Sequence, residues 1–469
     1  MAGDGSRGPL DQPCVPGQLR EDVAVRAEAT TETGVDHVFH TWSAQRAVHQ
    51  IKPVGAAGCW FWDSEGRRYL DFASQLVFLN LGHQHPALIA AIREQANRLC
   101  TVAPDFANDI RSELAELISA RAPGDLNYVF FTNAGTEANE HAIRMARLHT
   151  GRHKILSAYR SYHGATAGSI SLTGDPRRWA SEPGIPGVVH FLGPYLYRSS
   201  FGSHTEAEEC AAALAHLREV IEFEGPATIA AILLETVVGT NGVLLPPSGY
   251  LAGVRALCDE FGIVMGCDEV MVGFGRIGEW FAVNAWDVVP DLITFAKGVN
   301  SGYVPLGGVI VSEGIWTSFA DRPYPGGLTY SGHPLACAAG VASIRVFEET
   351  NLLDHVRRLG REVAEPALRD LMARHPSIGE VRGRGLFWAV ELVKNRQSRE
   401  MLVPFNASGA AKEPMTQLVA ACRELGLWPF SHFNRIHVAP PLIITAEELQ
   451  DGIGRLDQAL AVADRYVEG

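Results

Sequence analysis

The sequence lacks a long uncharged apolar run. A helix that crosses a bilayer needs about 18–20 such residues, and no segment of the 469-residue chain provides them. A secretory signal is missing as well, because residues 1–35 are rich in glycine, proline and charge and contain no apolar core. We therefore expect a cytoplasmic protein without membrane contact, and a flexible tail over residues 1–30.

Positive charge is scarce. The chain has 40 Lys and Arg against 53 Asp and Glu, which gives a formal net charge of −13. Binding to a phosphate backbone needs a surplus of Lys and Arg, so nucleic acid is not an expected partner. The acidic balance itself points to no particular function.

Paired cysteines are also missing. The chain has eight cysteines, none of them in a Cys-x-x-Cys pair of the kind that marks zinc and redox sites. Cys100, Cys210, Cys258 and Cys267 lie in apolar runs. We predict buried free thiols in a reducing compartment, without disulfides and without a metal site.

Short apolar runs alternate with helical stretches between about residues 127 and 312. The runs cover residues 128–132, 154–157, 188–192, 228–235, 263–267, 292–296 and 306–311, and helical patterns cover 137–149, 206–222 and 250–261. The runs are hydrophobic almost throughout, which is typical of parallel strands buried on both faces. The pattern predicts an α/β fold whose large domain has a mostly parallel seven-stranded sheet flanked by helices.

The two ends of the chain differ from this middle part. Residues 36–75 favour a few strands and turns, and residues 335–374 favour long amphipathic helices. Strands are predicted over 378–393 and 435–444, with a closing helix over 445–466. We predict an N-terminal segment (1–75) that packs with the small domain, a large domain (76–345) and a smaller α+β domain (346–469).

Polar groups follow several of the predicted strands. Gly135 and Thr136 open a helix, Glu235 and Asp268 end two strands, and Lys297 follows a third. Ligands of a doubly wound sheet bind outside the carboxyl ends of its strands. We therefore predict one site along this edge of the sheet.

Each of these groups has two interpretations when it is considered alone. The helix start at Gly135 suits a phosphate, or Thr136 is simply an N-cap. Asp268 suits a protonated ring nitrogen, or it is a buried structural carboxylate. A desolvated Lys297 is a nucleophile for carbonyls, or it extends to solvent.

One stretch matches the residue pattern of a dinucleotide-binding motif but not its structural context. Gly273-Phe274-Gly275-Arg276-Ile277-Gly278 fits G-x-G-x-x-G and follows a predicted strand. The genuine motif opens a helix, whereas here Glu279-Trp280-Phe281 and soon Pro290 follow. We predict that no nicotinamide cofactor binds there.

Taken together, these residues resemble the class III aminotransferases, which are pyridoxal-phosphate enzymes of fold type I. The likeness covers about residues 37–466 and is most specific where Asp268-Glu269-Val270 and Gly273-Phe274-Gly275-Arg276 are followed by Phe295-Ala296-Lys297-Gly298. The other stretches that carry it are Tyr69-Leu70-Asp71-Phe72, Gly82-His83, His85-Pro86, Phe131 to Asn139, Tyr162-His163-Gly164, Pro305-Leu306-Gly307-Gly308 and Thr329 to Pro334.

The resemblance implies a role for each residue of the predicted edge. Lys297 would form the Schiff base with pyridoxal 5'-phosphate and then carry the proton between the substrate and the cofactor. Asp268 would keep the pyridine nitrogen protonated, so that the ring accepts carbanion electrons. Val270 and Tyr162 would pack on the two faces of the ring.

Further contacts are implied around the cofactor. Gly135 and Thr136 would hold the phosphate, and Thr329 would reach the phosphate of the neighbouring subunit. The resemblance thus implies a homodimer with a shared active site, or a tetramer. Glu235 would lie near the hydroxyl side of the cofactor, and His163 would lie behind it.

The substrate is less clear from the sequence. The resemblance is closest to ω-amino-acid and amine transaminases, including taurine, β-alanine and diamine enzymes. Many of them bind the keto-acid carboxylate with an arginine near the C-terminal Pro-Pro, where counting back from Pro440-Pro441 places Phe430. This departure favours pyruvate over 2-oxoglutarate and donors without a second acid. Arg435 is an alternative carboxylate ligand, unless it is a solvated residue at a strand start.

The remaining expectations concern the pocket and rival functions. Trp42, Phe78 and Trp428 are candidate pocket walls, although large aromatic residues are more often part of the core. Rival functions on the same scaffold are an aminomutase, a racemase or a decarboxylase. A catalytically silent binding protein is another, against which the Lys297 and Asp268 pair argues.

Overall fold

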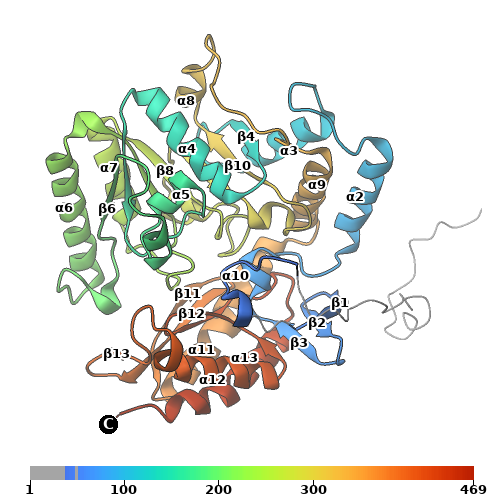
Figure 1. Cartoon of the computed structure of the whole chain (residues 1–469), viewed down its shortest axis with the longest axis vertical. Helices are drawn as coiled ribbons and strands as arrows, with labels where there is room; N and C mark the ends of the chain where they lie inside the picture. The colour runs from blue at the N-terminus through green and yellow to red at the C-terminus, as the bar shows by residue number, and fades with distance from the viewer. Residues whose placement is uncertain (1–36, 48–50, 469) are drawn as a thin grey trace, which may run out of the picture. The chain divides into compact units, whose positions relative to one another are not determined.

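A computed structural model describes residues 37–47 and 51–468 of the chain. Contacts divide the chain into two units, Met1–Ile51 and Lys52–Gly469. The described part of the first unit contains a short 3-10 helix, η1 (Gln45–Ala47). The tail expected over residues 1–30 lies outside the described residues. The second unit contains the sheets and all other helices of the described residues (Figure 1).

All seven predicted strands of the large sheet form. They are β4 (Tyr128–Thr132), β5 (Lys154–Ala158), β6 (Val188–Phe191), β7 (Ile229–Glu235), β8 (Val264–Asp268), β9 (Leu292–Phe295) and β10 (Gly307–Val311). Their order is β4-β10-β9-β8-β7-β5-β6. Only β10 runs antiparallel to its neighbours, and the other pairs are parallel. The predicted mostly parallel sheet is confirmed.

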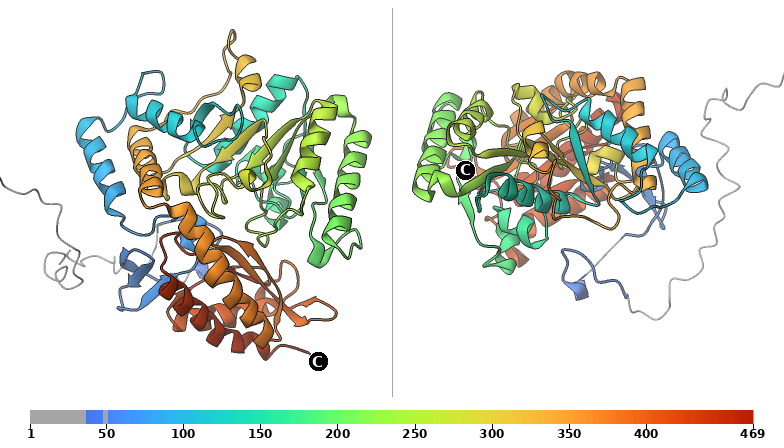
Figure 2. Two further views of the ribbon diagram at one scale, coloured as in Figure 1. Left: turned by 180° about the vertical axis from the view of Figure 1, so that it is seen from behind. Right: turned by 90° about the horizontal axis from the view of Figure 1, so that it is seen from above.

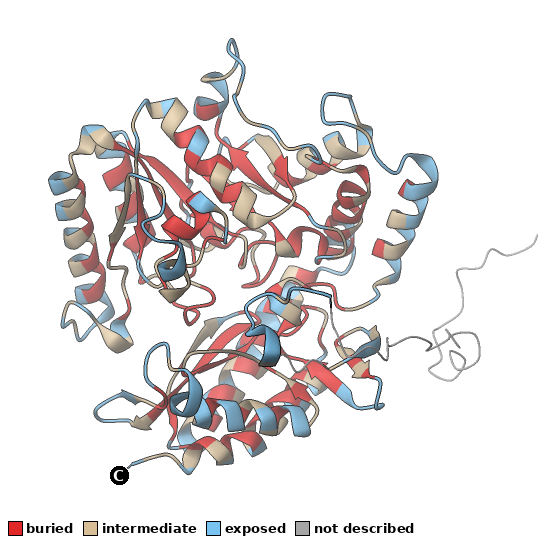
Figure 3. Ribbon diagram, viewed as in Figure 1, coloured by how far each residue is buried: buried red, intermediate tan, exposed pale blue. Residues whose placement is uncertain are grey.

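Helices cover both faces of this sheet (Figure 2). The three predicted helices are α4 (Gly135–Thr150), α6 (Glu206–Glu224) and α7 (Tyr250–Phe261). Side chains alternate along β7: Leu233 packs in the apolar cluster that contains α4, while Ile232 and Leu234 pack in the cluster that contains α6 and α7. This alternation follows from the two-residue repeat of a strand. The sheet is therefore buried on both sides (Figure 3).

Further short and long helices complete this part of the chain. They are α1 (Ser74–Val77), α2 (Pro86–Arg98), α3 (Asp109–Ser119), α5 (Ala167–Leu172), η2 (Pro176–Ser181), η3 (Leu196–Arg198), η4 (Pro226–Thr228), η5 (Ala282–Trp286), η6 (Lys297–Asn300), α8 (Glu313–Thr317) and α9 (Pro334–Glu349). The last of them continues through the domain boundary predicted at 345/346. The predicted boundaries at 75/76 and 345/346 stay predictions.

The C-terminal part forms a second, antiparallel sheet with helices. Its strands are β11 (Ile378–Arg384), β12 (Phe387–Asn395), β15 (Phe430–His432) and β16 (Arg435–Val438), with the short β13 (Glu400–Met401) paired to β12. Its helices are α10 (Leu352–Leu359), the short π-helix η7 (Gly360–Ala364), α11 (Glu365–Arg374), η8 (Gly409–Lys412), α12 (Glu413–Glu424) and α13 (Ala446–Asp464). The strand predicted over 435–444 ends at Val438, because Pro440 and Pro441 have no N–H for a ladder.

A third, small sheet joins distant parts of the sequence. Strands β1 (Pro53–Ala57), β2 (Trp60–Asp63) and β3 (Arg68–Asp71) form an antiparallel ribbon. Strand β14 (Leu427–Trp428) pairs with β3 in parallel. Residues 53–71 thereby pair with a strand that lies beyond β11 and β12 in the sequence.

The cysteines are free thiols in the described part of the chain. Six of them are buried, whereas Cys100 is exposed. The prediction that Cys100 is buried was wrong because it lies just beyond the end of α2, and Cys14 lies outside the described residues. Among residues 37–47 and 51–468, no helix is long and apolar enough to cross a bilayer.

Candidate active site

Asp268 is the last residue of β8, and its side chain is 4% exposed. Its Oδ2 accepts a hydrogen bond from Asn139 Nδ2 at 2.8 Å and lies 2.7 Å from His163 Nδ1. Its Oδ1 accepts from the backbone N–H of Val270 at 2.9 Å. Both oxygens are thus held by polar groups, and no arginine or lysine of the described chain forms an ion pair with Asp268.

A hydrogen-bond network fixes this carboxylate from behind. His163 is buried, and its Nε2 lies 3.2 Å from Ser157 Oγ. The Nδ2 of Asn139 also donates to the carbonyl of His163 at 2.7 Å, and its Oδ1 accepts from Thr294 Oγ1 at 2.9 Å. Asn139 was not predicted as a site residue. A carboxamide on the buried face of α4 was the signal for it, because buried amides need partners.

Lys297 follows β9 and starts η6 with a φ of 42°. This left-handed backbone is uncommon for a side chain other than glycine and is typical of functional sites. Burial lowers the pKa of the Lys297 amine to about 8, although the charges of Asp268 and Glu235 oppose this shift. About a tenth of the amine is therefore neutral and nucleophilic at pH 7, far more than in an ordinary lysine.

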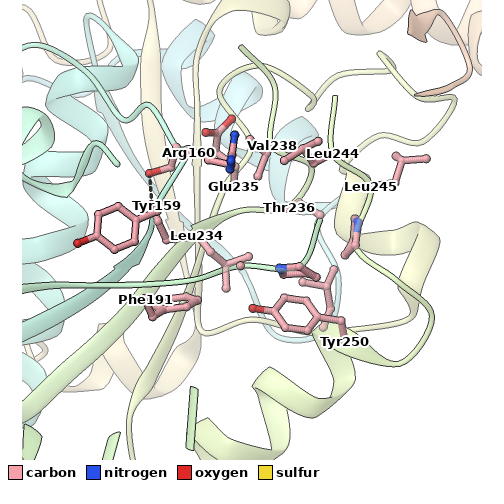
Figure 4. A pocket seen from close by; sticks show the side chains of 16 residues that line it. Tyr159, Arg160, Phe191, Leu234, Glu235, Thr236, Val238, Leu244, Leu245 and Tyr250 are labelled. Carbon is pink, nitrogen blue, oxygen red and sulfur yellow. Dashed lines mark hydrogen bonds between the residues drawn. The ribbon is translucent and has the colours of Figure 1, made fainter. Parts of the chain in front are cut away.

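Glu235 ends β7 and lies opposite Asp268 in the sheet register. Its two oxygens accept from the backbone N–H groups of Tyr162 at 2.9 Å and Gly239 at 2.7 Å. Burial raises the pKa of Glu235 to about 7. On another side, Glu235 lines a small cavity of about 40 Å³ together with Arg160 and mostly apolar residues (Figure 4).

The N-terminus of α4 has no side-chain cap. Its N-cap is Ala134, so the interpretation of Thr136 as an N-cap is wrong. Thr136 lies inside the first turn, and its Oγ1 accepts from the N–H groups of Ala165 and Thr166, each at 3.1 Å. A Cβ on Gly135 would come within 2.7 Å of Val270. Uncapped N–H groups at a helix start suit an anion.

Tyr162 lies at the same edge of the sheet, and its aromatic ring is half-buried. The guanidinium carbon of Arg177 lies over this ring, 3.6 Å from its centroid. Arg177 belongs to η2, and its Nε donates to both oxygens of Asp175, at 3.1 and 2.9 Å. No motif in the sequence marked Arg177, because it follows the tyrosine only after a helix and a turn.

The predicted pocket walls lie in several places. Phe78 is half-buried, and its ring contacts Gly302 so closely that a Cβ there would come within 2.4 Å. The ring of Phe430 lies 4.9 Å from that of His437. Trp428 packs against Phe61 and Tyr69, with ring centroids 5.5 and 5.8 Å apart.

Two predicted residues lie at the surface. Trp42 belongs to the first unit, and its side chain is 66% exposed. Thr329 is exposed and precedes Tyr330, which is 62% exposed. Thr329 is therefore not buried within a single chain.

Arg435 is buried, so its interpretation as a solvated residue is wrong. Its side chain is 1% exposed, and its Nε lies 3.3 Å from Glu391 Oε2. Glu391 also accepts hydrogen bonds from Tyr195, Arg198 and Arg382. Sequence spacing could not reveal this pairing, because the two residues meet only across β12 and β16.

The G-x-G-x-x-G sequence forms turns. The N–H of Phe274 donates to the carbonyl of Trp280 at 2.6 Å, and that of Gly275 to Glu279 at 3.0 Å. Arg276 is fully buried and donates to the carbonyl of Pro440 at 2.6 Å and to Asn80 Oδ1 at 2.7 Å. The stretch opens no helix, so it lacks the phosphate-binding geometry of a dinucleotide site.

Together these groups suit a planar, cationic heterocycle with an anionic tail and a carbonyl. Asp268 offers a negative charge, the start of α4 offers N–H groups, and Tyr162 and Val270 offer flat or apolar surfaces. Lys297 offers an amine that can condense with a carbonyl.

Comparisons with known proteins agree with this chemistry. The aminotransferase class III family model matches residues 43–460. A 5-aminovalerate aminotransferase from Pseudomonas aeruginosa is 36% identical over 88% of this chain and 94% of its own. A taurine–pyruvate aminotransferase from Bilophila wadsworthia is 31% identical over 92% and 96%.

Solved structures agree in fold as well. The crystal structure of a taurine:2-oxoglutarate aminotransferase from Bifidobacterium kashiwanohense, in complex with PLP and glutamate, has a TM-score of 0.88 and 45% identity over 92% of this chain and 96% of that one. A PMP-bound aminotransferase from Vibrio fluvialis has a TM-score of 0.86 and 30% identity, over 92% and 97%. The chain belongs to the class III aminotransferases and is a pyridoxal-phosphate-dependent enzyme of fold type I.

Proposed function

We propose that this aminotransferase carries its cofactor on Lys297 and moves an amino group from an ω-amino acid or amine to a keto acid such as pyruvate or 2-oxoglutarate. One observation carries the assignment of the site. A lysine whose pKa is lowered to about 8 lies close enough to the buried Asp268 to feel its charge. Within the described chain, Asp268 is hydrogen-bonded to Asn139, His163 and the Val270 N–H, and it forms no ion pair with an arginine or lysine.

The residues present fit pyridoxal phosphate. The phosphate would be held at the start of α4 by Gly135 and Thr136, where a larger residue at 135 would collide with Val270. Val270 would pack on one face of the cofactor ring and Tyr162 on the other, since both lie at the edge of the sheet where Asp268 ends β8. When bound, the cofactor supplies an electron sink for the carbanion at the substrate Cα.

The side chains of the protein would then share the work. The Lys297 amine would move the proton between the substrate and the cofactor. Asp268 would hold the proton on the ring nitrogen by its negative charge, while His163 and Asn139 keep its carboxylate in place. Glu235, whose pKa is about 7 because of burial, would lie near the hydroxyl side of the ring.

The substrate assignment is supported by the relatives. Both 5-aminovalerate and taurine carry an amine at one end and an acidic group at the other. Arg435 remains a candidate for a substrate carboxylate through its Nη1, a buried atom without a hydrogen-bond partner in the described chain. Its Nε, however, is already close to Glu391. Phe430 would form an apolar wall.

We also propose a homodimer in which Thr329 serves the phosphate of the partner subunit, with a tetramer as the alternative. The exposure of Thr329 and Tyr330 supports this assignment. Subunits with Lys297→Ala are mixed with subunits with a disabling change at Thr329. One intact site should return in the mixed dimers, and no return of activity despite subunit exchange would place Thr329 in its own site or in none. A cytoplasmic location stays a prediction.

The proposed function is tested in two steps. Borohydride reduction of the purified holoenzyme should fix the cofactor to the peptide that contains Lys297, and labelling of another peptide would refute the assignment. Amines and ω-amino acids are then incubated with pyruvate or 2-oxoglutarate. Turnover that needs an added keto acid identifies a transaminase. Turnover without one would instead indicate an aminomutase, a racemase or a decarboxylase.

A further inference from the structure

We propose that Arg177 binds the acidic group at the far end of the substrate, a carboxylate or a sulfonate. The enzyme would then select donors and acceptors that have such a group over uncharged ones of the same length. This inference rests on the proposed function and names the part of the substrate that the site recognises. It starts from the position of the guanidinium over the ring of Tyr162.

The position of Arg177 is fixed on two sides. One face of its guanidinium lies 3.6 Å from the centre of the Tyr162 ring. Its Nε and Nη2 donate to Asp175, whose side chain is 1% exposed and also accepts from Asn241 Nδ2 at 3.1 Å. A planar guanidinium offers more than one edge to a carboxylate, and an oriented one loses less entropy on binding.

Tyr162 connects Arg177 with the carboxylates at this edge of the sheet. The backbone N–H of Tyr162 binds Glu235, which faces Asp268 across two neighbouring strands. The charge of Arg177 also contributes to the lowered pKa of Lys297, after the larger effect of burial. The guanidinium therefore lies near the amine, but on the tyrosine side of the site.

The surroundings of Arg177 favour an anion. Burial is the main reason that the pKa of His432 falls to about 3, and the charges of Arg177, Arg435 and Lys412 add to the effect. The imidazole is therefore neutral at pH 7. Asp175 pairs with Arg177 and lies 4.0 Å from His432 Nε2, while Glu391 is shared by Arg435, Arg198 and Arg382. A ligand with one negative charge would reduce the excess of positive charge.

This assignment gives the site an acid-binding group that Phe430 cannot supply. Phe430 takes the place of the arginine expected near Pro440 and contacts His437. The cation would come from η2 of the large sheet region instead. The apolar wall at 430 alone favours pyruvate, but a cation at 177 favours 2-oxoglutarate, which has a second carboxylate.

The test compares matched substrates on Arg177→Met and on a control, Arg178→Met. Arg178 is the next residue, with a side chain that is 18% exposed and pairs with Glu182 at 3.0 Å. For the full-length holoenzymes, kcat/KM is measured with 5-aminopentanoate against pentylamine. It is then measured with 2-oxoglutarate against 2-oxopentanoate.

The expected result is a selective loss. Arg177→Met should lower kcat/KM for the acid-ended substrate of each pair by about 10- to 100-fold, as when a hydrogen bond to a charged group is removed. The uncharged partner of each pair should change by less than about 3-fold, since it makes no ionic contact. Arg177→Lys should recover part of the preference, and Arg178→Met should leave it unchanged.

Other results would overturn the inference. Equal losses for both members of a pair, or a changed absorbance of the bound cofactor with an unchanged substrate preference, would show that Arg177 only supports Tyr162. Wild-type enzyme without any preference for acid-ended substrates would also refute it. These outcomes leave the proposed transaminase intact, whereas a wild-type enzyme that transfers no amino group from any donor would refute the proposed function itself.

Discussion

Two of the buried carboxylates of this enzyme, Asp268 and Glu391, lie in different sheets and have opposite surroundings. Asp268, at the end of β8, is held by an amide, an imidazole and a backbone N–H. Glu391, in β12, is held by three arginines and a tyrosine hydroxyl. Both are almost inaccessible to water, with side-chain exposures of 4% and 0%.

The two carboxylates differ in the groups that neutralise their negative charge. Burial alone would raise the pKa of Glu391, but the charges of Arg382, Arg435 and Arg198 outweigh it and hold the pKa well below the usual range. The protein therefore satisfies Glu391 by itself. Asp268 receives orientation but little positive charge. A buried anion without a positive partner destabilises the protein until a cationic group binds next to it. We therefore infer that Asp268 serves to bind a ligand and that Glu391 serves to stabilise the fold.

The first prediction removes the charge at the site. Asp268→Asn should lower kcat by about 100-fold or more, because electrostatic stabilisation in the transition state is lost. The matched control is Glu269→Gln. Glu269 is equally buried, but its carboxylate accepts from Ala282 N, Val283 N and Thr236. Steady-state kinetics of the reconstituted enzymes should show a far smaller effect for the control.

Near-normal turnover in Asp268→Asn would contradict the different roles of the two carboxylates, since Asp268 would then be structural like Glu391. Thermal unfolding of both variants separates the two effects. We expect Glu269→Gln to lower stability more than kcat, and Asp268→Asn to do the reverse.

The second prediction removes the charge in the small sheet. Glu391→Gln should lower the free energy of unfolding by about 3–5 kcal/mol, because the buried Arg435 and the partly buried Arg198 and Arg382 lose a shared carboxylate. Glu380→Gln is the control, since Glu380 is 28% exposed and, within residues 37–47 and 51–468, forms an ion pair with Arg382 alone. Chemical denaturation at pH 7 measures both. A loss of less than about 1 kcal/mol for Glu391→Gln would mean that its pairs are no stronger than surface ones.

The same carboxylate gives a pH dependence whose sign is fixed. Its pKa is lower in the folded protein than its ordinary value of 4.5, so the unfolded chain binds more protons in acid. The stability that Glu391 contributes is therefore present above about pH 4.5 and is lost as the pH falls toward the folded pKa. In Glu391→Gln this part of the acid sensitivity should disappear.

The third prediction weakens the support of Asp268 without removing its charge. His163→Gln should lower kcat by about 10-fold, the effect of one lost hydrogen bond to a charged group. The pH at which the bound cofactor changes its absorbance should also shift, because the position of the carboxylate sets the basicity of the ring nitrogen. An unchanged absorbance profile with lower stability would show that His163 is only a packing residue.

The sheet could be predicted from sequence because burial on both faces leaves a continuous apolar signal. All seven runs form strands of one sheet, in which Glu235 and Asp268 end β7 and β8 and Lys297 follows the adjacent β9. The strand after Arg435 was predicted too long, since hydrophobicity does not record the missing N–H groups of Pro440 and Pro441.

The supporting residues could not be predicted in this way. Asn139 reaches Asp268 across a strand–helix crossing, and Arg177 reaches Tyr162 from beyond α5. A solvated position was one of two interpretations of Arg435, because arginines are usually exposed, but Glu391 lies opposite it on β12. Each pairing depends on how elements pack, and local sequence carries no record of that geometry.

The last and smallest expected effect concerns Lys297 itself. Burial lowers its pKa from 10.5 to about 8, and only the neutral amine attacks an aldehyde. The rate at which pyridoxal phosphate attaches to the apoenzyme should therefore rise about 5-fold between pH 7 and 8, and less than about 2-fold between pH 8 and 9. An ordinary lysine would continue to gain about 10-fold per pH unit up to its own pKa. Stopped-flow absorbance follows the attachment, with Lys297→Ala as the control for the other lysines. A rate that keeps rising through pH 9 would show that the Lys297 amine is solvated before the cofactor binds. Burial would then affect the charges of Asp268 and Glu391 but not the pKa of Lys297.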